Sequence, residues 1–197
     1  MKKLIIAVVG SMKSRKSGYI IDIIKQYIDK GKRVKTFYPA CLEKEEGYII
    51  SRNGTKSRAI PVSEPINMFA HIGKSDLIAI DEISFIDNCN EKQTKDFMDF
   101  LNLCIIKDID VIVAGLDLDF RGKSFRIVGE ILSFADKVEK LYSTCEICGS
   151  EYGRRCIRYV GNKPASLQDS VIQMESENIS YKTVCTKCFN GIYYNEL

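Results

Sequence analysis

The sequence predicts an α/β fold built on a parallel sheet, followed by a smaller cysteine-rich domain. Short apolar segments alternate with amphipathic helical stretches over most of the 197 residues, which is the pattern of strands joined by crossover helices. Near Ser143 this alternation stops, and two pairs of cysteines follow. We therefore expect a core domain of residues 1–143 and a second domain of residues 144–197.

Five apolar segments predict the strands of the sheet. The first, residues 4–9, is a continuous apolar run without alternation, as expected for a strand buried on both faces of a parallel sheet. The other four are residues 33–38, 77–80, 111–114 and 137–142.

The helices are predicted from apolar side chains at helical spacing. One helix is expected to run from Ile20 to Ile28 and to end at Gly31, and another is expected to run from Phe97 to Ile105. Residues 41–67 are polar and rich in turn residues, and they lack this rhythm.

The composition is that of an ordinary soluble globular protein, with 45% hydrophobic and 28% charged residues. A net charge of +3 without a basic block gives no electrostatic footprint for DNA or RNA, so we expect no nucleic-acid partner. The longest strongly apolar run is too short to span a bilayer, and charged residues interrupt it before a signal-peptide pattern can form. We therefore expect a cytoplasmic protein without a membrane partner.

The turn between the first strand and the first helix is a candidate phosphate site. It begins at Gly10 and ends with Lys16 and Ser17, the setting in which G-x-x-x-x-G-K-[ST] binds phosphate through backbone N–H groups at a helix N-terminus. Lys16 would reach the β- and γ-phosphates of ATP, and Ser17 would hold Mg²⁺. The predicted ATP site of this turn comprises Gly10, Ser11, Met12, Lys13, Ser14, Arg15, Lys16 and Ser17.

The predicted strand at residues 77–80 ends in two carboxylates, Asp81 and Glu82. In phosphoryl-transfer enzymes a carboxylate at such a strand end holds Mg²⁺, and a second one can act on the acceptor hydroxyl. Ser84 is included with Asp81 in the predicted ATP and Mg²⁺ site. A phosphate loop on the first strand and an acidic end on a later buried strand are far more specific together than either is alone.

The second domain contains the pairs Cys145/Cys148 and Cys185/Cys188, each with C-x-x-C spacing. Four thiolates close the coordination sphere of a tetrahedral zinc ion, so the predicted site is structural. A redox role is disfavoured because neither pair is predicted to open a helix after a buried strand. The residues between the pairs would form a loop tied at its base and suited to cover a ligand. The remaining cysteines are interpreted as small buried hydrophobes: Cys41, Cys89, Cys104 and Cys156.

From Gly10 to Cys188 the chain resembles the type II thymidine kinases. The resemblance rests on the phosphate loop with Met12, on residues 59–62 and 77–82, and most closely on residues 111–122 with Phe125. The order of the two cysteine pairs, with Ser180 and Tyr181 before the second pair, completes it.

The resemblance implies ATP-dependent phosphorylation of the 5′-hydroxyl of thymidine, with Mg²⁺ bound to ATP and with structural zinc. It implies that Glu82 is the catalytic base. It also implies a lasso loop in the zinc-binding domain, which covers the nucleoside through its backbone, and a homotetramer. The positions that match the thymine pocket of the family are Met12, Phe85, Leu116, Phe120, Phe125 and Tyr181.

Departures from the family pattern leave a second interpretation open. Arg15 replaces the glycine of the phosphate loop, and residues 174–176, Met-Glu-Ser, stand where the lasso usually has glycines. If Arg15 needs a positive φ, its backbone costs on the order of 1–2 kcal/mol. The alternative is a nucleotide-binding or regulatory protein that keeps the fold and the zinc but has impaired catalysis. A zinc-ribbon nucleic-acid binder is a third class, which the missing basic patch disfavours.

Overall fold

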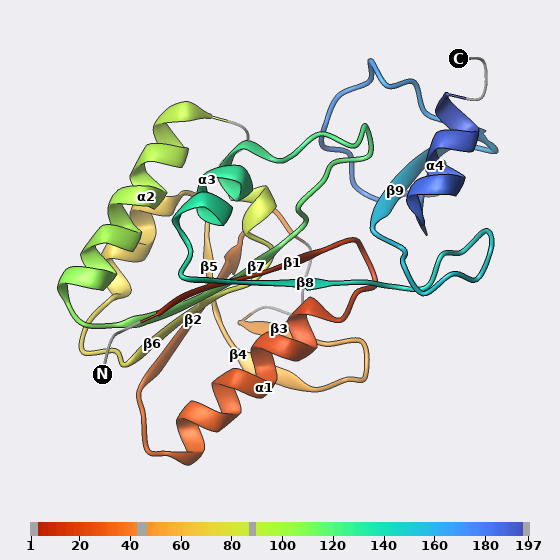
Figure 1. Ribbon diagram of the computed structural model, residues 1–197. Coiled ribbons are helices and arrows are strands. Elements are labelled where there is room, and N and C mark those ends of the chain that lie inside the picture. Colours follow the sequence, from red (N-terminus) through yellow and green to blue (C-terminus); the bar gives the residue numbers. More distant parts are fainter. Residues whose placement is uncertain (1–3, 43–46, 87–89, 195–197) are drawn as a thin grey trace.

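The computed structural model describes residues 4–42, 47–86 and 90–194 (Figure 1). Its core is a six-stranded sheet in which every neighbouring pair of strands is parallel, with the order β5-β2-β6-β7-β1-β8. The strands are β1 Ile5–Gly10, β2 Val34–Pro39, β5 Ile60–Val62, β6 Leu77–Ile80, β7 Asp110–Gly115 and β8 Lys137–Leu141. The predicted parallel α/β core is therefore confirmed.

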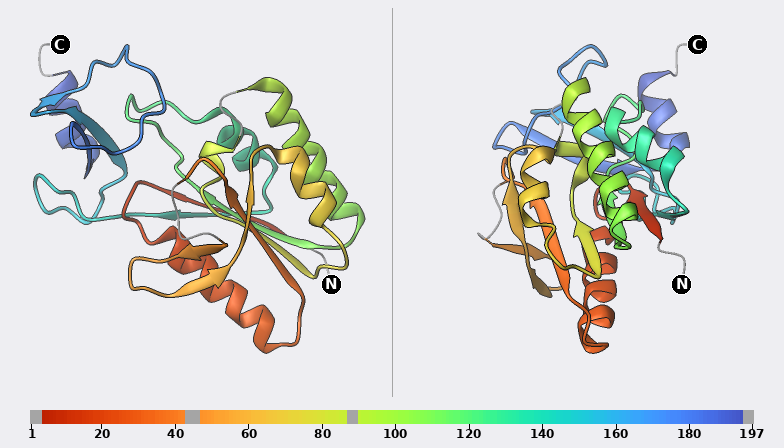
Figure 2. Two further views of the ribbon diagram at one scale, coloured as in Figure 1. Left: turned by 180° about the vertical axis from the view of Figure 1, so that it is seen from behind. Right: turned by 90° about the vertical axis from the view of Figure 1, so that its left-hand side faces the viewer.

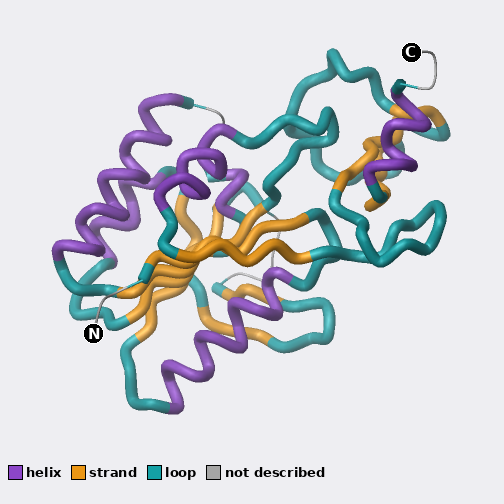
Figure 3. The backbone as a smooth tube through the Cα atoms, in the orientation of Figure 1, coloured by secondary structure: helices purple, strands orange, loops and turns teal. Residues whose placement is uncertain are grey.

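Helices cover both faces of this sheet. Helices α2 and α3 lie on one side, and α1 lies on the other with the hairpin of β3 and β4 (Figures 1 and 3). The helices are α1 Lys16–Asp29, α2 Glu91–Ile106 and α3 Arg126–Phe134, with the 3-10 helices η1 Pro65–His71 and η2 Ile83–Phe85; the hairpin strands are β3 Tyr48–Ile50 and β4 Lys56–Arg58. No helix in the described part of the chain combines the length and hydropathy that a membrane span needs.

The central strands are buried on both faces because their side chains alternate between two apolar cores. In β1, Ala7 and Val9 belong to the core beneath α2 and α3, whereas Val8 belongs to the core beneath α1. Likewise, Ile78 of β6 belongs to the core beneath α2 and α3, and Ile112 of β7 belongs to the core beneath α1. Full burial of one such large aliphatic side chain contributes roughly 1.5–3 kcal/mol, so the two cores hold the sheet rigid at the edge that carries the site.

The five predicted strands correspond to β1, β2, β6, β7 and β8, with ends shifted by at most one residue, and the two predicted helices correspond to α1 and α2. Residues 41–67 contain more regular structure than expected, namely the β3–β4 hairpin and β5. Strand β5 has only three residues, and Pro61 at its centre is exposed. Helix α3 was also not predicted, because it has only nine residues and includes Gly129. Short elements of this kind leave little periodicity to detect.

The C-terminal module, residues 144–194, folds around an antiparallel three-stranded sheet of order β10-β9-β11. Its elements are β9 Arg155–Val160, β10 Lys163–Pro164, β11 Ile179–Val184 and α4 Thr186–Tyr193. Ile157, Val184 and Phe189 form its small core together with buried cysteines. The module projects from the end of the core at which β1 and β8 finish (Figures 1 and 2). The domain boundary at residue 143 remains a prediction, and it falls between β8 and β9.

Candidate active site

The candidate site lies at the carboxyl edge of the parallel sheet, where ligands bind in folds of this kind. A cavity of about 1300 Å³ opens there between the core and the C-terminal module. Segments that follow four different strands line it: residues 12–17 of the P-loop (residues 10–17) after β1, Glu82 and Phe85 after β6, residues from the loop 116–125 after β7, and Tyr142 after β8. The β3–β4 turn and residues 171–175 of the module complete the wall.

The P-loop wraps tightly because Gly10 has no side chain. A Cβ built on Gly10 would lie 2.2 Å from the backbone oxygen of Leu141, a distance that no real side chain tolerates. Ser14 is buried, and its hydroxyl has no hydrogen-bond partner among the described residues. An orphaned buried hydroxyl in a strand–turn–helix loop fits an anion as its partner. Lys16 is also buried, and its ammonium group donates to Ser11 O at 2.7 Å, so it is held at the loop itself.

Two non-glycine residues of the P-loop have left-handed backbones, Lys13 with φ 65° and Arg15 with φ 66°. Arg15 is the N-cap of α1, and its side chain is exposed and lines the cavity. Position 15 therefore has the positive φ for which glycine is favoured, and arginine adopts it. Alternating left- and right-handed residues turn successive N–H groups to the same side, which forms an anion-binding nest.

The P-loop and the acidic strand end meet directly. The hydroxyl of Ser17 donates to Asp81 Oδ2 at 3.0 Å, and Asp81 is fully buried. Glu82 follows with φ 55°, so the chain turns sharply and places Glu82 on the cavity wall. A hydroxyl and a carboxylate oxygen in contact beside a phosphate loop are the groups that hold Mg²⁺ in P-loop proteins.

Ser84, which is predicted to belong to the ATP and Mg²⁺ site, does not line the cavity. It is fully buried, and its hydroxyl accepts a hydrogen bond from the backbone N–H of Leu116 at 3.0 Å. A Cβ on Gly115 would lie 2.7 Å from Ile83 Cγ2, so glycine is needed for this close approach of β7 to η2. Ser84 thereby joins the two segments that carry Phe85 and Leu116.

Four residues of the predicted ATP and Mg²⁺ site are absent from the cavity wall: Gly10, Ser11, Asp81 and Ser84.

All six residues predicted for the nucleoside pocket line the same cavity. Phe85 and Phe125 pack with ring centroids 6.1 Å apart. Phe120 and Phe125 are almost fully buried, which makes this end of the cavity apolar and aromatic. The six residues are Met12, Phe85, Leu116, Phe120, Phe125 and Tyr181.

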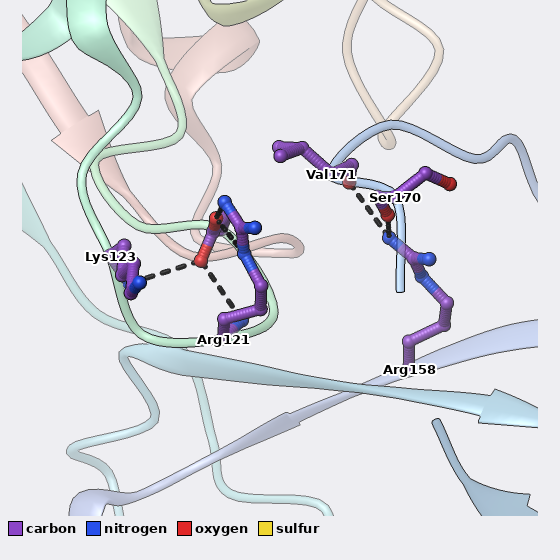
Figure 4. Close-up of polar contacts among 6 residues, drawn as sticks. Arg121, Lys123, Arg158, Ser170 and Val171 are labelled. Carbon is purple, nitrogen blue, oxygen red and sulfur yellow. Dashed lines mark hydrogen bonds and ion pairs between the residues drawn. The ribbon is translucent and has the colours of Figure 1, made fainter. Parts of the chain in front are cut away.

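One buried arginine organises the apolar, aromatic end of the cavity. Arg158 of β9 has no exposed surface, and its guanidinium lies 3.7 Å above the ring of Phe120. Its side chain donates to the backbone oxygens of Ser170 (2.8 Å) and Val171 (2.7 Å), as Figure 4 shows. It also donates to Gln173 Oε1 (2.8 Å) and to the hydroxyl of Tyr181 (2.9 Å). Charge-assisted hydrogen bonds of this kind are the strong ones, so this residue anchors the covering segment, residues 165–178.

Tyr181 completes the same network. Its hydroxyl donates to Gln173 O at 2.7 Å while it accepts from Arg158. Burial raises the pKa of Tyr181, and the nearby Arg158 opposes that shift. The shift is in the direction that favours the neutral phenol, which is the form that donates.

The loop after β7 is shaped by Asp119. Its carboxylate accepts hydrogen bonds from the backbone N–H groups of Arg121 (2.9 Å) and Lys123 (3.0 Å), and the guanidinium of Arg121 contacts it as well (Figure 4). Asp119 is almost fully buried. This capped turn fixes the position from which Phe120 reaches the cavity.

The two cysteine pairs form one cluster. The sulfur atoms of Cys145, Cys148, Cys185 and Cys188 all lie within 4.8 Å of one another, and those of Cys148 and Cys185 are 3.7 Å apart. Four sulfurs at ~2.3 Å from a tetrahedral zinc ion are separated by about 3.8 Å, so the cluster fits this metal. Burial would raise the pKa of Cys145, but backbone N–H groups of residues 147, 148 and 185 lower it to about 6. At Cys145 these N–H groups favour the thiolate that zinc requires, whereas at Cys188 the hydrogen bond with the Cys148 thiol raises the pKa to about 12.

Two expectations about the cysteines are wrong. Cys185 directly follows β11 and caps α4, so this pair does open a helix after a strand; its sulfur nevertheless belongs to the four-sulfur cluster. Cys41 is exposed rather than buried, because it lies just beyond the end of β2 and lines the cavity. Cys104 and Cys156 are buried as predicted. Cys89 lies outside the described residues.

Several residues that line the cavity or support its wall carry no signal that the sequence analysis used. Arg158 is a single charged residue in a short strand, and nothing in the pattern indicates that it is buried. Cys156 was interpreted as core, yet it lines the cavity. Tyr19 and Asp22, on the first turns of α1, also face the cavity. Tyr19 follows Lys16 by three residues and Asp22 follows Tyr19 by three, so each is a surface neighbour of the one before it, a spacing that could have indicated both.

Fold and site together define a P-loop protein with a phosphate-binding turn, an acidic strand end and an apolar pocket at one sheet edge. The family model described as thymidine kinase matches residues 3–189, so the chain belongs to the thymidine kinase family.

Solved structures give a more distant likeness. The chain is similar to AMPPCP-bound DnaA from Aquifex aeolicus, with 17% identity and a TM-score of 0.43 over 72% of this chain and 41% of that one. It is similarly related to the replication initiator DnaA bound to AMPPCP and single-stranded DNA, with 16% identity and a TM-score of 0.43 over 71% and 40%. The chain therefore spans less than half the length of these structures. A likeness of this degree says nothing about its function.

Proposed function

We propose that this chain is a thymidine kinase that transfers the γ-phosphoryl group of ATP to the 5′-hydroxyl of thymidine. The observation that carries the proposal is the Ser17–Asp81 hydrogen bond of 3.0 Å, with Glu82 and an aromatic pocket in the same cavity. Membership of the thymidine kinase family supports nucleoside phosphorylation in general.

The P-loop binds the triphosphate in this scheme. Its N–H groups and the ammonium of Lys16 bind the phosphate oxygens, and Ser17 and Asp81 hold Mg²⁺. When bound, Mg²⁺ neutralises charge on the β- and γ-phosphates. The ammonium has three N–H groups, of which one is directed at Ser11 O, and the others are available to phosphate.

Glu82 acts on the acceptor. Its carboxylate accepts the proton of the 5′-hydroxyl while that oxygen bonds to the γ-phosphorus. The bond from the γ-phosphorus to the bridging oxygen breaks, and ADP leaves. The rest of the chain positions the nucleoside: the six apolar and aromatic residues hold the base, and the covering segment, residues 165–178, excludes water as a lasso.

Zinc at the four-cysteine cluster has a structural role in this proposal, because four thiolates leave no coordination position for water. Family membership further suggests a homotetramer that acts in DNA precursor salvage in the cytoplasm. Light scattering of the purified protein tests the oligomeric state.

The experiment that tests the proposal measures ADP formation by purified protein with Mg·ATP and a panel of deoxynucleosides. We expect ADP formation that depends on thymidine and is weaker with the other deoxynucleosides. Nucleotide binding without turnover on any nucleoside would contradict the proposal and favour the alternative, a nucleotide-binding protein with impaired catalysis.

A further inference from the structure

In the described part of the chain, polar contacts join three residues of the P-loop to the C-terminal module. The hydroxyl of Ser11 donates to Gly153 O at 2.9 Å, and the hydroxyl of Thr183 donates to Met12 O at 2.9 Å. The ammonium of Lys13 lies 2.7 Å from Glu146 Oε2. The contacts reach three successive P-loop residues from three separate segments of the module, which adjoins the β1–α1 turn (Figure 1).

Glu146 and Thr183 form one unit within the module. Glu146 Oε1 accepts from the N–H of Thr183 at 2.7 Å, and the N–H of Glu146 donates to Thr183 O at 2.9 Å. Glu146 lies between Cys145 and Cys148, and Thr183 lies two residues before Cys185. The unit is therefore fixed by both halves of the cysteine cluster.

The P-loop conformation requires such support. Lys13 and Arg15 are left-handed non-glycine residues, and each costs on the order of 1–2 kcal/mol. Strained backbone of this kind persists only where the surrounding structure over-determines it. The contacts lie at the first left-handed residue, Lys13, and at the two residues before it, so they hold the turn where the strain begins.

We propose that Glu146 and Thr183 are positioning residues for phosphate binding, which brace the P-loop from the cysteine module without touching the nucleotide. The inference rests on the proposed function for its ligand, a nucleoside triphosphate, but the brace itself is a property of the nucleotide-free protein. Because binding couplings are reciprocal, phosphate bound at the P-loop also stabilises the module.

The amide of Tyr19 reports on the brace in the absence of any nucleotide. It donates to Arg15 O at 3.0 Å, so its protection from hydrogen exchange depends on the left-handed turn. The variants are Glu146→Gln, which removes the charge, and Thr183→Val, which removes the hydroxyl but keeps the shape. Glu151→Gln is the matched control, because Glu151 is an exposed glutamate of the same module.

We measure hydrogen–deuterium exchange of the peptide that contains Tyr19, zinc content, and the affinity for Mg·ATP by calorimetry. Glu146→Gln and Thr183→Val should each raise exchange at this peptide by about tenfold and weaken Mg·ATP binding by about three- to tenfold, the range that the loss of one or two hydrogen bonds produces. Zinc content should stay at that of the wild type, and the control should match the wild type throughout.

A double variant sharpens the result. If the Lys13–Glu146 pair acts as a unit, Lys13→Met combined with Glu146→Gln should raise exchange no further than Glu146→Gln alone. Wild-type exchange in both Glu146→Gln and Thr183→Val, with zinc retained, would overturn the brace. Absence of Mg·ATP binding in the wild type would instead contradict the proposed function, and the exchange data would still decide the inference.

Discussion

The two ends of the cavity are built in different ways. At the end where we propose that phosphate binds, the binding groups would be main-chain N–H groups of a strained turn, supported by short polar side chains such as Ser17. At the proposed nucleoside end, the wall consists of side chains and of a covering segment to which Arg158 donates three side-chain hydrogen bonds, and a fourth joins Arg158 to Tyr181. The phosphate end thus depends on backbone geometry, whereas the nucleoside end depends on one buried side chain. Substitutions should therefore affect the two ends separately.

Removal of the metal is expected to have the largest effect, because the C-terminal module contacts both ends. A structural zinc site contributes about 10–16 kcal/mol of apparent binding energy in small zinc domains. Chelation, or Cys148→Ser, should therefore unfold the module and abolish activity. Elemental analysis should find about one zinc per chain in the wild type and in the control Cys41→Ser. A zinc-free wild type with all eight thiols titratable in the native state would exclude the site.

The next largest effect concerns Glu82, which lies where the two ends meet. Glu82→Gln keeps the shape but removes the basic carboxylate, so turnover should fall by roughly 10² to 10⁴. The affinity for Mg·ATP should change little. Steady-state kinetics with Glu130→Gln as a surface control give the comparison. Near-normal turnover in Glu82→Gln would show that another group takes the proton.

Arg158 tests the nucleoside end alone. Arg158→Met keeps much of the packing on Phe120 but loses the hydrogen bonds to the covering segment. Hydrogen bonds to a charged group are worth about 1.5–3 kcal/mol, so the affinity for thymidine should fall by at least about tenfold.

Calorimetry should show Mg·ATP binding to Arg158→Met within about twofold of the wild type, with Lys163→Met as the control on the exposed strand β10. Arg158→Lys should be intermediate at best, because an ammonium cannot form the same fork of hydrogen bonds. Equal losses in thymidine and Mg·ATP affinity would show that the two ends are not separable.

Arg15 tests the phosphate end and has the smallest expected effect. Glycine adopts φ 66° without strain. We expect nucleotide binding to leave this backbone conformation unchanged, so that its strain cancels in the binding free energy. Loss of the positive charge should then lower Mg·ATP affinity in Arg15→Gly by less than about tenfold, or ~1.4 kcal/mol. Undetectable binding in the wild type that appears in Arg15→Gly would show that arginine blocks the site.

Whether a feature could be predicted from the sequence depends on whether it is determined by nearby residues or by residues far away in the chain. Strands such as β6, buried on both faces, leave a continuous apolar run that local sequence reveals. The cysteine cluster was predictable because C-x-x-C spacing lets two thiolates of each pair bind one metal ion. Arg158 could not be predicted, since its burial depends on the path of a segment more than ten residues away. The contacts of Glu146 and Thr183 with the P-loop could not be predicted from the sequence either, because they join parts of the chain far apart in sequence.

The central claim is that one cavity transfers a phosphoryl group to the 5′-oxygen of thymidine. The most direct test is to incubate the wild type with Mg·ATP and thymidine and to identify the products by ³¹P NMR and mass spectrometry. Thymidine 5′-monophosphate and ADP should form in equal amounts. ADP that accumulates without thymidine 5′-monophosphate, or bound ATP that remains intact in the presence of thymidine, would contradict the account.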